Sequence, residues 1–265
     1  MVRRNIISFM ANASIKLRLL QYVADRNSLF LIGRGDGIGA QILNTVINKS
    51  ICEVFGIPAK TVRLSSAEHI SPSELNQWLK EFESLFDTSD VKIDYCQDRL
   101  LNYKHKLLTL KRHKISLSLL DDLLRDNNIT YQIQPTIRMY LKTFEQKLEK
   151  RVCLHYRAGD IYNFKKYEDR RISTHIYQEN LQRYDEMSLP LYIVTNDRVR
   201  ATEAFPNCTI ICENGFADYQ FLRASQYKIL SFSAFSYLAA LQGGGEITLP
   251  PKKSIYDNLL SYENK

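Results

Sequence analysis

The chain has 265 residues, of which 45% are hydrophobic and 25% are charged, and its formal net charge is +7 at pH 7. This composition is typical of a globular protein and excludes collagen-like, low-complexity and disordered chains. Every apolar stretch is shorter than the ~18 residues of a membrane span. We therefore expect a cytoplasmic protein of one large or two small domains. Peripheral contact of the basic N-terminus with the inner face of the membrane is the alternative.

The cysteines give no sign of a disulfide framework or a metal site. They are odd in number, irregularly spaced and without a C-x-x-C pair, which favours small buried thiols in a reducing compartment. The chain also lacks an Asp-x-Asp sequence, so we expect no bound metal. The five residues are Cys52, Cys96, Cys153, Cys208 and Cys212.

The first half of the chain alternates predicted strands with predicted helices. Ile42, Val46 and Ile47 recur at helical spacing behind a glycine-rich turn, so a helix with these side chains turned inward is expected there. The predicted strands are 28–32 and 61–64, and the predicted helices are 14–26, 40–55, one that begins at Ser71, and a basic, leucine-rich one within 91–126.

A glycine cluster, Gly33–Gly39, lies between the first of these strands and the helix that follows it. Glycines allow a tight turn and a close approach of the backbone to a ligand, and a helix N-terminus offers free N–H groups to an anion. Gly35, Gly37 and Gly39 are therefore candidate binding residues. Read from Gly35, the cluster matches a relaxed dinucleotide pattern, but no clear ribose-binding acid follows the second strand, and a P-loop ending is missing. A tight turn without a ligand is the alternative.

The second half has strands at regular intervals with helices between them. Such alternation predicts parallel β-α-β units, whose ligands bind at the carboxyl ends of the strands. A polar, charged stretch separates the halves, so we expect two Rossmann-like domains, 1–150 and 151–265. The predicted strands are 152–156, 191–195, 209–212, 229–231 and 246–249, and the predicted helices are 174–187, 218–226 and 234–242.

The first strand of the second half runs into the sequence His-Tyr-Arg-Ala-Gly-Asp, residues 155–160. His155 and Arg157 lie two residues apart, so a strand places both on one face. Arg157 can fork onto phosphate oxygens, and His155 can donate to a phosphate or sugar oxygen. Asp160 can hold the arginine or accept a proton. A surface-exposed chance occurrence is the alternative.

Two further segments place polar side chains directly after strands. One is the Thr-Asn-Asp that ends the strand at 191–195, where a nucleoside would be held. The other follows the strand at 229–231 and opens a helix, whose hydroxyls and free amides would form a phosphate cradle. The alternative is that Ser231 and Ser233 only cap that helix. The candidate donor-binding residues of these segments are Thr195, Asn196, Asp197, Ser231, Ser233, Phe235 and Ser236.

These segments resemble the fucosyltransferase-like glycosyltransferases of the GT-B fold, and most of all the bacterial α-1,2-fucosyltransferases. That family has a Gly-Gly-Leu-Gly-Asn-Gln loop near its N-terminus, where this chain has residues 35–41, and a His-x-Arg-Arg-Gly-Asp sequence after a strand, where it has 155–160. The family then has Ser/Thr-Asp-Asp and Asn-Ser-Thr-Phe-Ser-Trp-Trp, where this chain has residues 195–197 and 232–237. The four matches occur in the order of the family.

The resemblance implies an α/β, GT-B-like fold, with an acceptor-side domain and a donor domain that face each other across a cleft. It implies a metal-independent, inverting transfer of a sugar, with fucose from GDP-fucose as the first expectation, and no cofactor. The acceptor would be a glycan or lipid-linked oligosaccharide of surface polysaccharide or glycoconjugate synthesis. Arg157 would neutralise the leaving diphosphate, assisted by His155 and by the amides near Ser233 and Phe235. Asp36 and Asp160 are the candidate acceptor bases, and their order is open.

Three positions depart from the family pattern. Ala158 stands where the family has a second arginine, Asn196 stands for an acid, and Ala234 stands for a hydroxyl. Two other functions are therefore weighed: a degenerate glycosyltransferase-fold protein that binds without turnover, and a Rossmann enzyme that binds a dinucleotide at Gly35. Nucleic acid is not expected as a partner, because the basic residues are spread along the chain. The locally basic stretch 104–114 better suits an acceptor-facing or membrane-facing surface.

Overall fold

The computed structural model describes residues 29–32, 38–54, 59–62, 80–81, 124–125, 127–141, 147–254 and 256–260. The chain divides into two compact units, Met1–Leu141 and Lys142–Lys265. The division lies between Leu141 and Lys142, whereas the sequence places it after residue 150. Strand β3 (Glu149–Tyr156) begins before that predicted boundary, so the whole strand belongs to the second unit.

The first unit contains a parallel β-α-β arrangement. Strands β1 (Leu29–Ile32) and β2 (Ala59–Val62) pair in parallel, and helix α2 (Ile38–Val54) lies between them in sequence. These elements confirm the strand predicted at 28–32 and the helix predicted at 40–55, and the second strand lies two residues earlier than expected. The helices predicted at 14–26 and from Ser71 lie almost wholly outside the described residues, as does most of 91–126.

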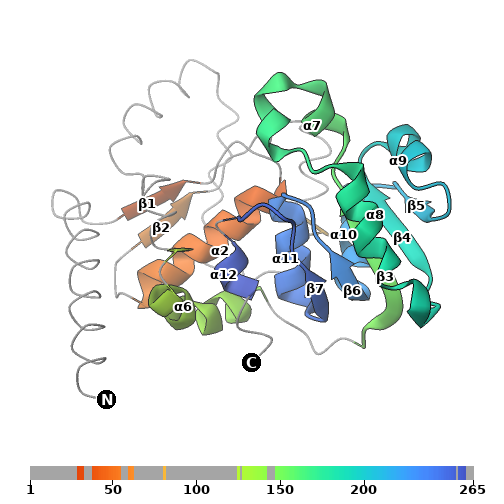
Figure 1. The fold of residues 1–265 in the computed structure, drawn as a ribbon. Coiled ribbons are helices and arrows are strands. Elements are labelled where there is room, and N and C mark those ends of the chain that lie inside the picture. Colours follow the sequence, from red (N-terminus) through yellow and green to blue (C-terminus); the bar gives the residue numbers. More distant parts are fainter. Residues whose placement is uncertain are drawn as a thin grey trace. The chain divides into compact units, whose positions relative to one another are not determined.

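Helix α2 packs against α6 (Asn127–Tyr140), which the sequence analysis did not predict. Ile42, Val46 and Ile47 are buried, as the helical spacing predicts. At the end of α6, the Tyr140 hydroxyl donates a hydrogen bond to Glu53, and the Lys49 ammonium lies 4.2 Å from the centroid of the Tyr140 ring. Apolar burial and these polar contacts together hold the two helices side by side (Figure 1).

The second unit is built around a five-stranded sheet in which every pair of neighbouring strands is parallel. Its elements are β3 (Glu149–Tyr156), α7 (Gly159–Asn163), η1 (Lys165–Arg170), α8 (Thr174–Gln182), η2 (Asp185–Met187), β4 (Leu191–Thr195), α9 (Arg198–Ala204), β5 (Thr209–Ile211), α10 (Gly215–Ala224), β6 (Ser225–Ile229), α11 (Ala234–Gly243), β7 (Glu246–Thr248) and α12 (Asp257–Leu260). The predicted α/β class, with parallel strands between helices, is therefore confirmed.

The order of the strands is β5-β4-β3-β6-β7. The chain starts at the centre with β3, moves outward through β4 to β5, and then crosses back to β6 and β7 on the other side of β3. The direction of winding therefore reverses between β3 and β6. In open sheets of this kind, ligands bind outside the carboxyl ends of the strands at that reversal, because the flanking loops diverge there.

Side chains of β3 alternate between the two faces of the sheet. Val152, Leu154 and Tyr156 join the buried cluster that includes residues of α8 and α9. The residues between them face the other side, where the rings of His155 and Phe235 of α11 lie 5.1 Å apart. Helices α10 and α11 pack against each other on that side (Figure 1). Side chains on one face of β3 thus pack into the cluster with α8 and α9, and His155 on the other face packs against α11.

Two boundaries in the second unit differ from the sequence predictions. Strand β6 spans Ser225–Ile229, so the prediction of a strand at 229–231 after a helix to residue 226 is wrong. The reason is Lys228, which is fully buried and interrupts the apolar pattern, and whose ammonium donates to the carbonyls of Ser225 and Gly244. The helix predicted at 174–187 is α8 followed by the short helix η2.

Of the cysteines that the structure describes with their side chains, Cys153 is buried and Cys208 and Cys212 are half-buried, and all three are free thiols. Burial raises the pKa of Cys153 to about 12, so its thiol stays protonated and packs as a small apolar group. Across the described ranges, no helix combines the length and the apolar character that crossing a membrane requires.

Candidate functional site

The carboxyl ends of β3 and β6 are adjacent, because Leu154 of β3 pairs with Ile229 of β6. Residues singled out in the sequence lie at or just after these ends: His155 within β3 and Arg157 after it, and Ser231 and Ser233 after β6. The structure brings these four residues together at the point where the winding of the sheet reverses. This group is called the switch-point cluster below.

His155 and Ser231 form the buried part of the switch-point cluster. Only 7% of His155 and 2% of Ser231 are exposed, and the Nδ1 atom of the imidazole lies 2.7 Å from the Ser231 hydroxyl oxygen. The imidazole also packs against the Phe235 ring at 5.1 Å between centroids and an interplanar angle of 32°. A hydrogen bond at one ring atom and a packed face together fix the position and plane of the ring.

Arg157 reaches the helix that follows β6. Its Nη1 atom donates a hydrogen bond of 3.4 Å to the hydroxyl of Ser233, the residue that precedes the first turn of α11. The Ser233 hydroxyl makes no capping bond to the helix. A guanidinium therefore lies beside a helix N-terminus, whose first N–H groups have no acceptor within the helix. Both features favour an anion at this place.

Ser236 has the contacts of a structural residue. It is fully buried in the first turn of α11, and its hydroxyl lies 3.1 Å from the carbonyl oxygen of Ser231 and 2.9 Å from that of Ser233, to which it donates. It therefore holds the loop between β6 and α11 in shape. The ring of the neighbouring Phe235 packs against the rings of His155 and Tyr219, with centroid separations of 5.1 and 5.6 Å.

Asn196 joins the loop after β4 to the loop after β3. Its Oδ1 atom accepts hydrogen bonds from the backbone N–H groups of Ala158 and Gly159, each at 3.1 Å. The approach is close: a Cβ atom on Gly159 would lie 2.9 Å from the Asn196 side-chain amide nitrogen, so the Asn196 side chain would have to shift. An oxygen acceptor is the feature that an asparagine and an acid share, so Asn196 can serve here where the resembled family has an acid.

We expect Asn196→Ala to lower the free energy of unfolding by about 1–2 kcal/mol, because two N–H donors lose their acceptor. Asn196→Asp keeps an oxygen at that position and should retain most of the stability. Urea unfolding followed by circular dichroism measures both variants. Equal losses for the alanine and aspartate variants would contradict this role of the side-chain oxygen.

Thr195 and Asp197 make local bonds around the first turn of α9. The Thr195 hydroxyl accepts the N–H of Asp197 at 3.1 Å, and Asp197 caps the helix by accepting the N–H of Arg200 at 3.1 Å. A second Asp197 oxygen lies 3.9 Å from Arg200 Nε. These contacts are those of helix capping, and a role in nucleoside binding stays a prediction.

Ala158 is fully buried within the cluster that covers the other face of β3. Tyr156, two residues earlier, points into the same cluster, and burial raises its pKa to about 12. The position at which the resembled family carries its second arginine is thus an apolar core position in this chain.

Several predicted residues lie partly or wholly outside the described structure. Asp36, Gly35 and Gly37 fall outside it, whereas Gly39 is a buried residue at the start of α2. Asp160 is the second residue of α7, and its side chain is not described. Asp36 and Asp160 therefore stay predictions as acceptor bases.

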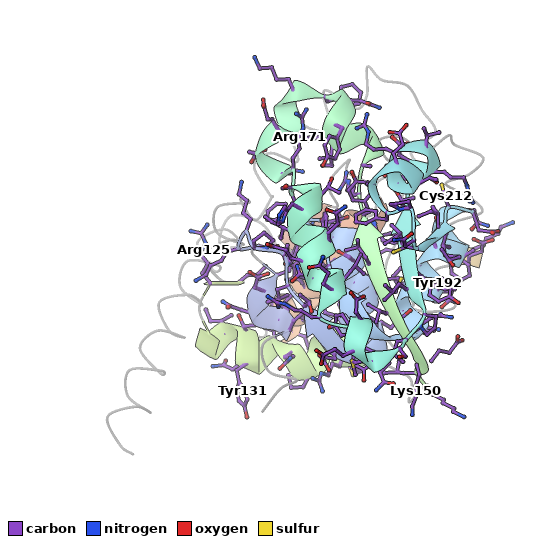
Figure 2. All side chains as sticks on the ribbon, turned by 45° about the vertical axis from the view of Figure 1, so that its right-hand side comes forward. Arg125, Tyr131, Lys150, Arg171, Tyr192 and Cys212 are labelled. Carbon is purple, nitrogen blue, oxygen red and sulfur yellow. The ribbon has the colours of Figure 1, made fainter. Side chains whose placement is uncertain are left out.

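A basic group around Tyr162 was not predicted from the sequence. Arg171 and Arg200 lie over the ring of Tyr162, at 5.5 and 4.7 Å from its centroid. Arg171, labelled in Figure 2, also donates to the carbonyls of Ile161 and Tyr162 at 3.0 and 3.2 Å. Tyr162, Arg171 and Arg200 come from three different segments, so no sequence spacing connects them.

In the part of the chain that the structure describes, no three His, Cys, Asp or Glu side chains come together as a metal site would require. The switch-point cluster instead combines the Arg157 cation with the His155 imidazole and the hydroxyls of Ser231 and Ser233. The cluster is therefore suited to bind an anion or the oxygens of a polar ligand.

Comparisons with solved structures find glycosyltransferases. The chain is similar to the fucosyltransferase NodZ from Bradyrhizobium, with 12% identity, a TM-score of 0.45, and coverage of 81% of this chain and 93% of that chain. It is similar to NodZ α-1,6-fucosyltransferase co-crystallised with GDP at 12% identity and a TM-score of 0.43, over 81% and 92% of the two chains. It is also similar to the E. coli heptosyltransferase WaaC with ADP at 7% identity and a TM-score of 0.42, over 89% and 97%.

No protein-family model and no curated protein matches the sequence significantly.

Proposed function

We propose that this chain is a glycosyltransferase that moves a sugar from a nucleotide donor to a hydroxyl of a glycan acceptor. One observation carries the proposal: Arg157 hydrogen-bonds to Ser233 at the N-terminus of α11, so a fixed cation and a helix N-terminus converge between β3 and β6. A nucleoside diphosphate carries its charge on oxygens that accept from both kinds of donor.

The place of the cluster supports a nucleotide in particular. The reversal point of a doubly wound parallel sheet leaves a crevice at the carboxyl ends of the two central strands. His155 and Arg157 enter it from β3, and the loop before α11 enters it from β6. We infer that the diphosphate lies across these two loops, and that the nucleoside extends toward the end of β4, where Thr195 is the last residue of the strand and Asn196 and Asp197 follow it.

The reaction would be a single displacement at the anomeric carbon. The acceptor oxygen forms the new bond, the bond from the anomeric carbon to the diphosphate oxygen breaks, and the nucleoside diphosphate leaves with both electrons. The configuration inverts because the acceptor attacks opposite the leaving group. Arg157 neutralises the charge that develops on the diphosphate, and fixed donors do this without reorganisation. The acceptor proton goes to a carboxylate, for which Asp160 and Asp36 remain the candidates.

The identity of the donor follows from the sequence resemblance, which favours GDP-fucose. The same resemblance gives the donor side to the C-terminal domain, predicted as residues 151–265, and the acceptor side to the N-terminal domain, predicted as residues 1–150. The acceptor would be a glycan or a lipid-linked oligosaccharide of surface polysaccharide or glycoconjugate synthesis. A peripheral position at the inner face of the membrane would suit a lipid-linked acceptor.

A second candidate function is a degenerate glycosyltransferase-fold protein that binds a glycan or partner without turnover. The buried Ala158 favours it, because the resembled family has a second arginine at this position. The two candidates differ in whether a nucleoside diphosphate binds to the native protein, and this can be measured directly.

We expect GDP to stabilise the protein against thermal unfolding. A ligand that binds only the native state adds about 2.7 kcal/mol when its concentration is a hundred times its Kd. A thermal-shift series with GDP, GDP-fucose, UDP, CDP, CMP and NAD measures this effect for each class of nucleotide. A shift with GDP and GDP-fucose but not with NAD would support the proposal.

The other outcomes separate the alternatives. A shift with UDP or a cytidine nucleotide would keep a glycosyltransferase and exclude a GDP-sugar donor. A shift with NAD alone would favour a dinucleotide-dependent Rossmann enzyme. If no nucleotide shifted the transition, the proposed enzymatic function would be contradicted and the binding protein favoured.

A further inference from the structure

The contacts of the buried Ser231 hydroxyl determine which atom accepts its hydrogen bond. The residue is 2% exposed, and His155 Nδ1 lies 2.7 Å from its oxygen. Within the described residues, no other acceptor is found in hydrogen-bond distance of this oxygen. The carbonyl of Ser231 is itself an acceptor, of the Ser233 N–H at 2.8 Å and of the Ser236 hydroxyl at 3.1 Å.

Two arrangements of the Ser231–His155 hydrogen bond can be compared. If Nδ1–H donates to the serine oxygen, the serine O–H is left buried without an acceptor, which is unfavourable. If the serine O–H donates to Nδ1, the serine hydroxyl has its acceptor, and the proton of the neutral imidazole is then on Nε2. The second arrangement is favoured because buried donors in proteins are nearly always paired.

We infer that Ser231 is a positioning residue that holds His155 as the neutral tautomer with its proton on Nε2. In this tautomer Nε2 is a hydrogen-bond donor, so His155 donates to an oxygen and does not take the proton of the acceptor hydroxyl. The inference rests on the proposed function in one respect, that the oxygen belongs to the phosphate or sugar of a nucleotide donor. Because His155 does not take the proton of the acceptor hydroxyl, this inference leaves the role of acceptor base to a carboxylate.

The surroundings of His155 make this tautomer useful for binding. Phe235 packs on the imidazole and limits its rotation, and Arg157 occupies the same side of the β3 end two residues later. A neutral Nε2–H donor beside a guanidinium provides two donors to neighbouring oxygens of one anion. Ser231 itself need not touch the ligand, because its hydroxyl hydrogen is already given to Nδ1.

The tautomer can be measured directly by NMR on the full chain with ¹⁵N-labelled histidine. The chain has five histidines, and the signals of His155 are those absent in His155→Gln. At about pH 8.5, well above the ordinary histidine pKa of about 6.5, we expect a pyrrole-type shift for Nε2 and a pyridine-type shift for Nδ1. A pyridine-type shift for Nε2 in the wild type would overturn the inference, and this result needs no variant.

Ser231→Ala tests whether the serine is the cause, and Ser225→Ala is the matched control. We expect Ser231→Ala to move both His155 ¹⁵N shifts toward the average of the two tautomers. Ser225→Ala removes a buried hydroxyl at the opposite end of β6, which donates to the Phe221 carbonyl and accepts from Arg151 Nε, so the two His155 shifts should stay in place. Ser231→Thr, which keeps the hydroxyl, should restore the wild-type shifts. Unchanged shifts in Ser231→Ala would contradict the inference.

GDP binding measured by calorimetry separates this inference from the proposed function. If Ser231→Ala lowers the fraction of His155 with its proton on Nε2 to about a third, the apparent Kd for GDP rises about threefold. Because Ser231 acts through His155, Ser231→Ala should cause no further loss in a His155→Ala background. Additive losses would contradict the positioning role while leaving the function intact. If GDP failed to bind to the wild type, the proposed function would fall, and the NMR spectra would still decide the tautomer.

Discussion

Replacing Arg157 with alanine is expected to weaken GDP binding by about tenfold or more, because charged hydrogen bonds to a phosphate are worth about 1.5–3 kcal/mol. The loss of transfer activity should be larger, about 2–4 kcal/mol in activation free energy, because charge on the diphosphate grows as the sugar leaves. The fold should persist, since Arg157 is half-buried and follows the end of β3. Calorimetry with GDP and the rate of GDP release from GDP-fucose measure the two effects.

Two further variants make this experiment specific. Arg157→Lys keeps the charge without the fork of N–H donors, so we expect an intermediate loss. Arg198→Ala is the matched control: Arg198 begins α9 at the same edge of the sheet, but its guanidinium bonds to the carbonyls of Ile210 and Cys212, away from the switch-point cluster. If Arg157→Ala bound GDP like the wild type, or if Arg198→Ala lost as much, the assignment of the site would be wrong.

The sequence was sufficient for most of the second unit because its strands are short, buried and apolar. Val152–Tyr156 and Leu191–Thr195 stand out as apolar runs that end in polar residues, and both are strands of the sheet. The apolar pattern fails at β6, where the ammonium of the buried Lys228 donates hydrogen bonds to two carbonyls inside the protein. A period based on hydropathy alone cannot detect such a contact.

Helix α6 shows a different limit of sequence reasoning. Ile129, Ile133 and Ile137 recur every four residues and are all buried, which is the signal of a helix face. Pro135 lies inside the same helix and removes one backbone donor, so it normally indicates a helix boundary. Packing of α6 on α2 compensates for the cost of the proline.

The candidate site was predictable in its position and less so in its details. The spacing of His155 and Arg157 places them on one face, and the strand order brings Ser231 and Ser233 beside them. The sequence does not distinguish a ligand-binding Asp, Asn or Ser from one that caps a helix, because the same oxygen atoms do both. Asp197, which caps α9, shows why contacts are needed.

Ala158→Arg would recreate the second arginine of the resembled family, and we expect it to destabilise the protein by about 3–5 kcal/mol, the cost of a buried charge without a partner. Ala158 is fully buried among apolar side chains that include Tyr156 and Ile172. A guanidinium at this position must either enter that cluster or displace the turn that Asn196 holds. Urea unfolding measures the loss, and calorimetry with GDP should show no gain in affinity.

Val199→Arg is the matched control for this variant. It adds the same side chain in α9 at a position that is 71% exposed, where substitutions usually change stability by less than about 0.5 kcal/mol. The comparison isolates burial from charge. If Ala158→Arg were as stable as Val199→Arg and bound GDP more tightly than the wild type, the missing arginine would limit donor binding. If Ala158→Arg is strongly destabilised, Ala158 is a core residue. The proposed diphosphate binding then depends on Arg157 and the N-terminus of α11.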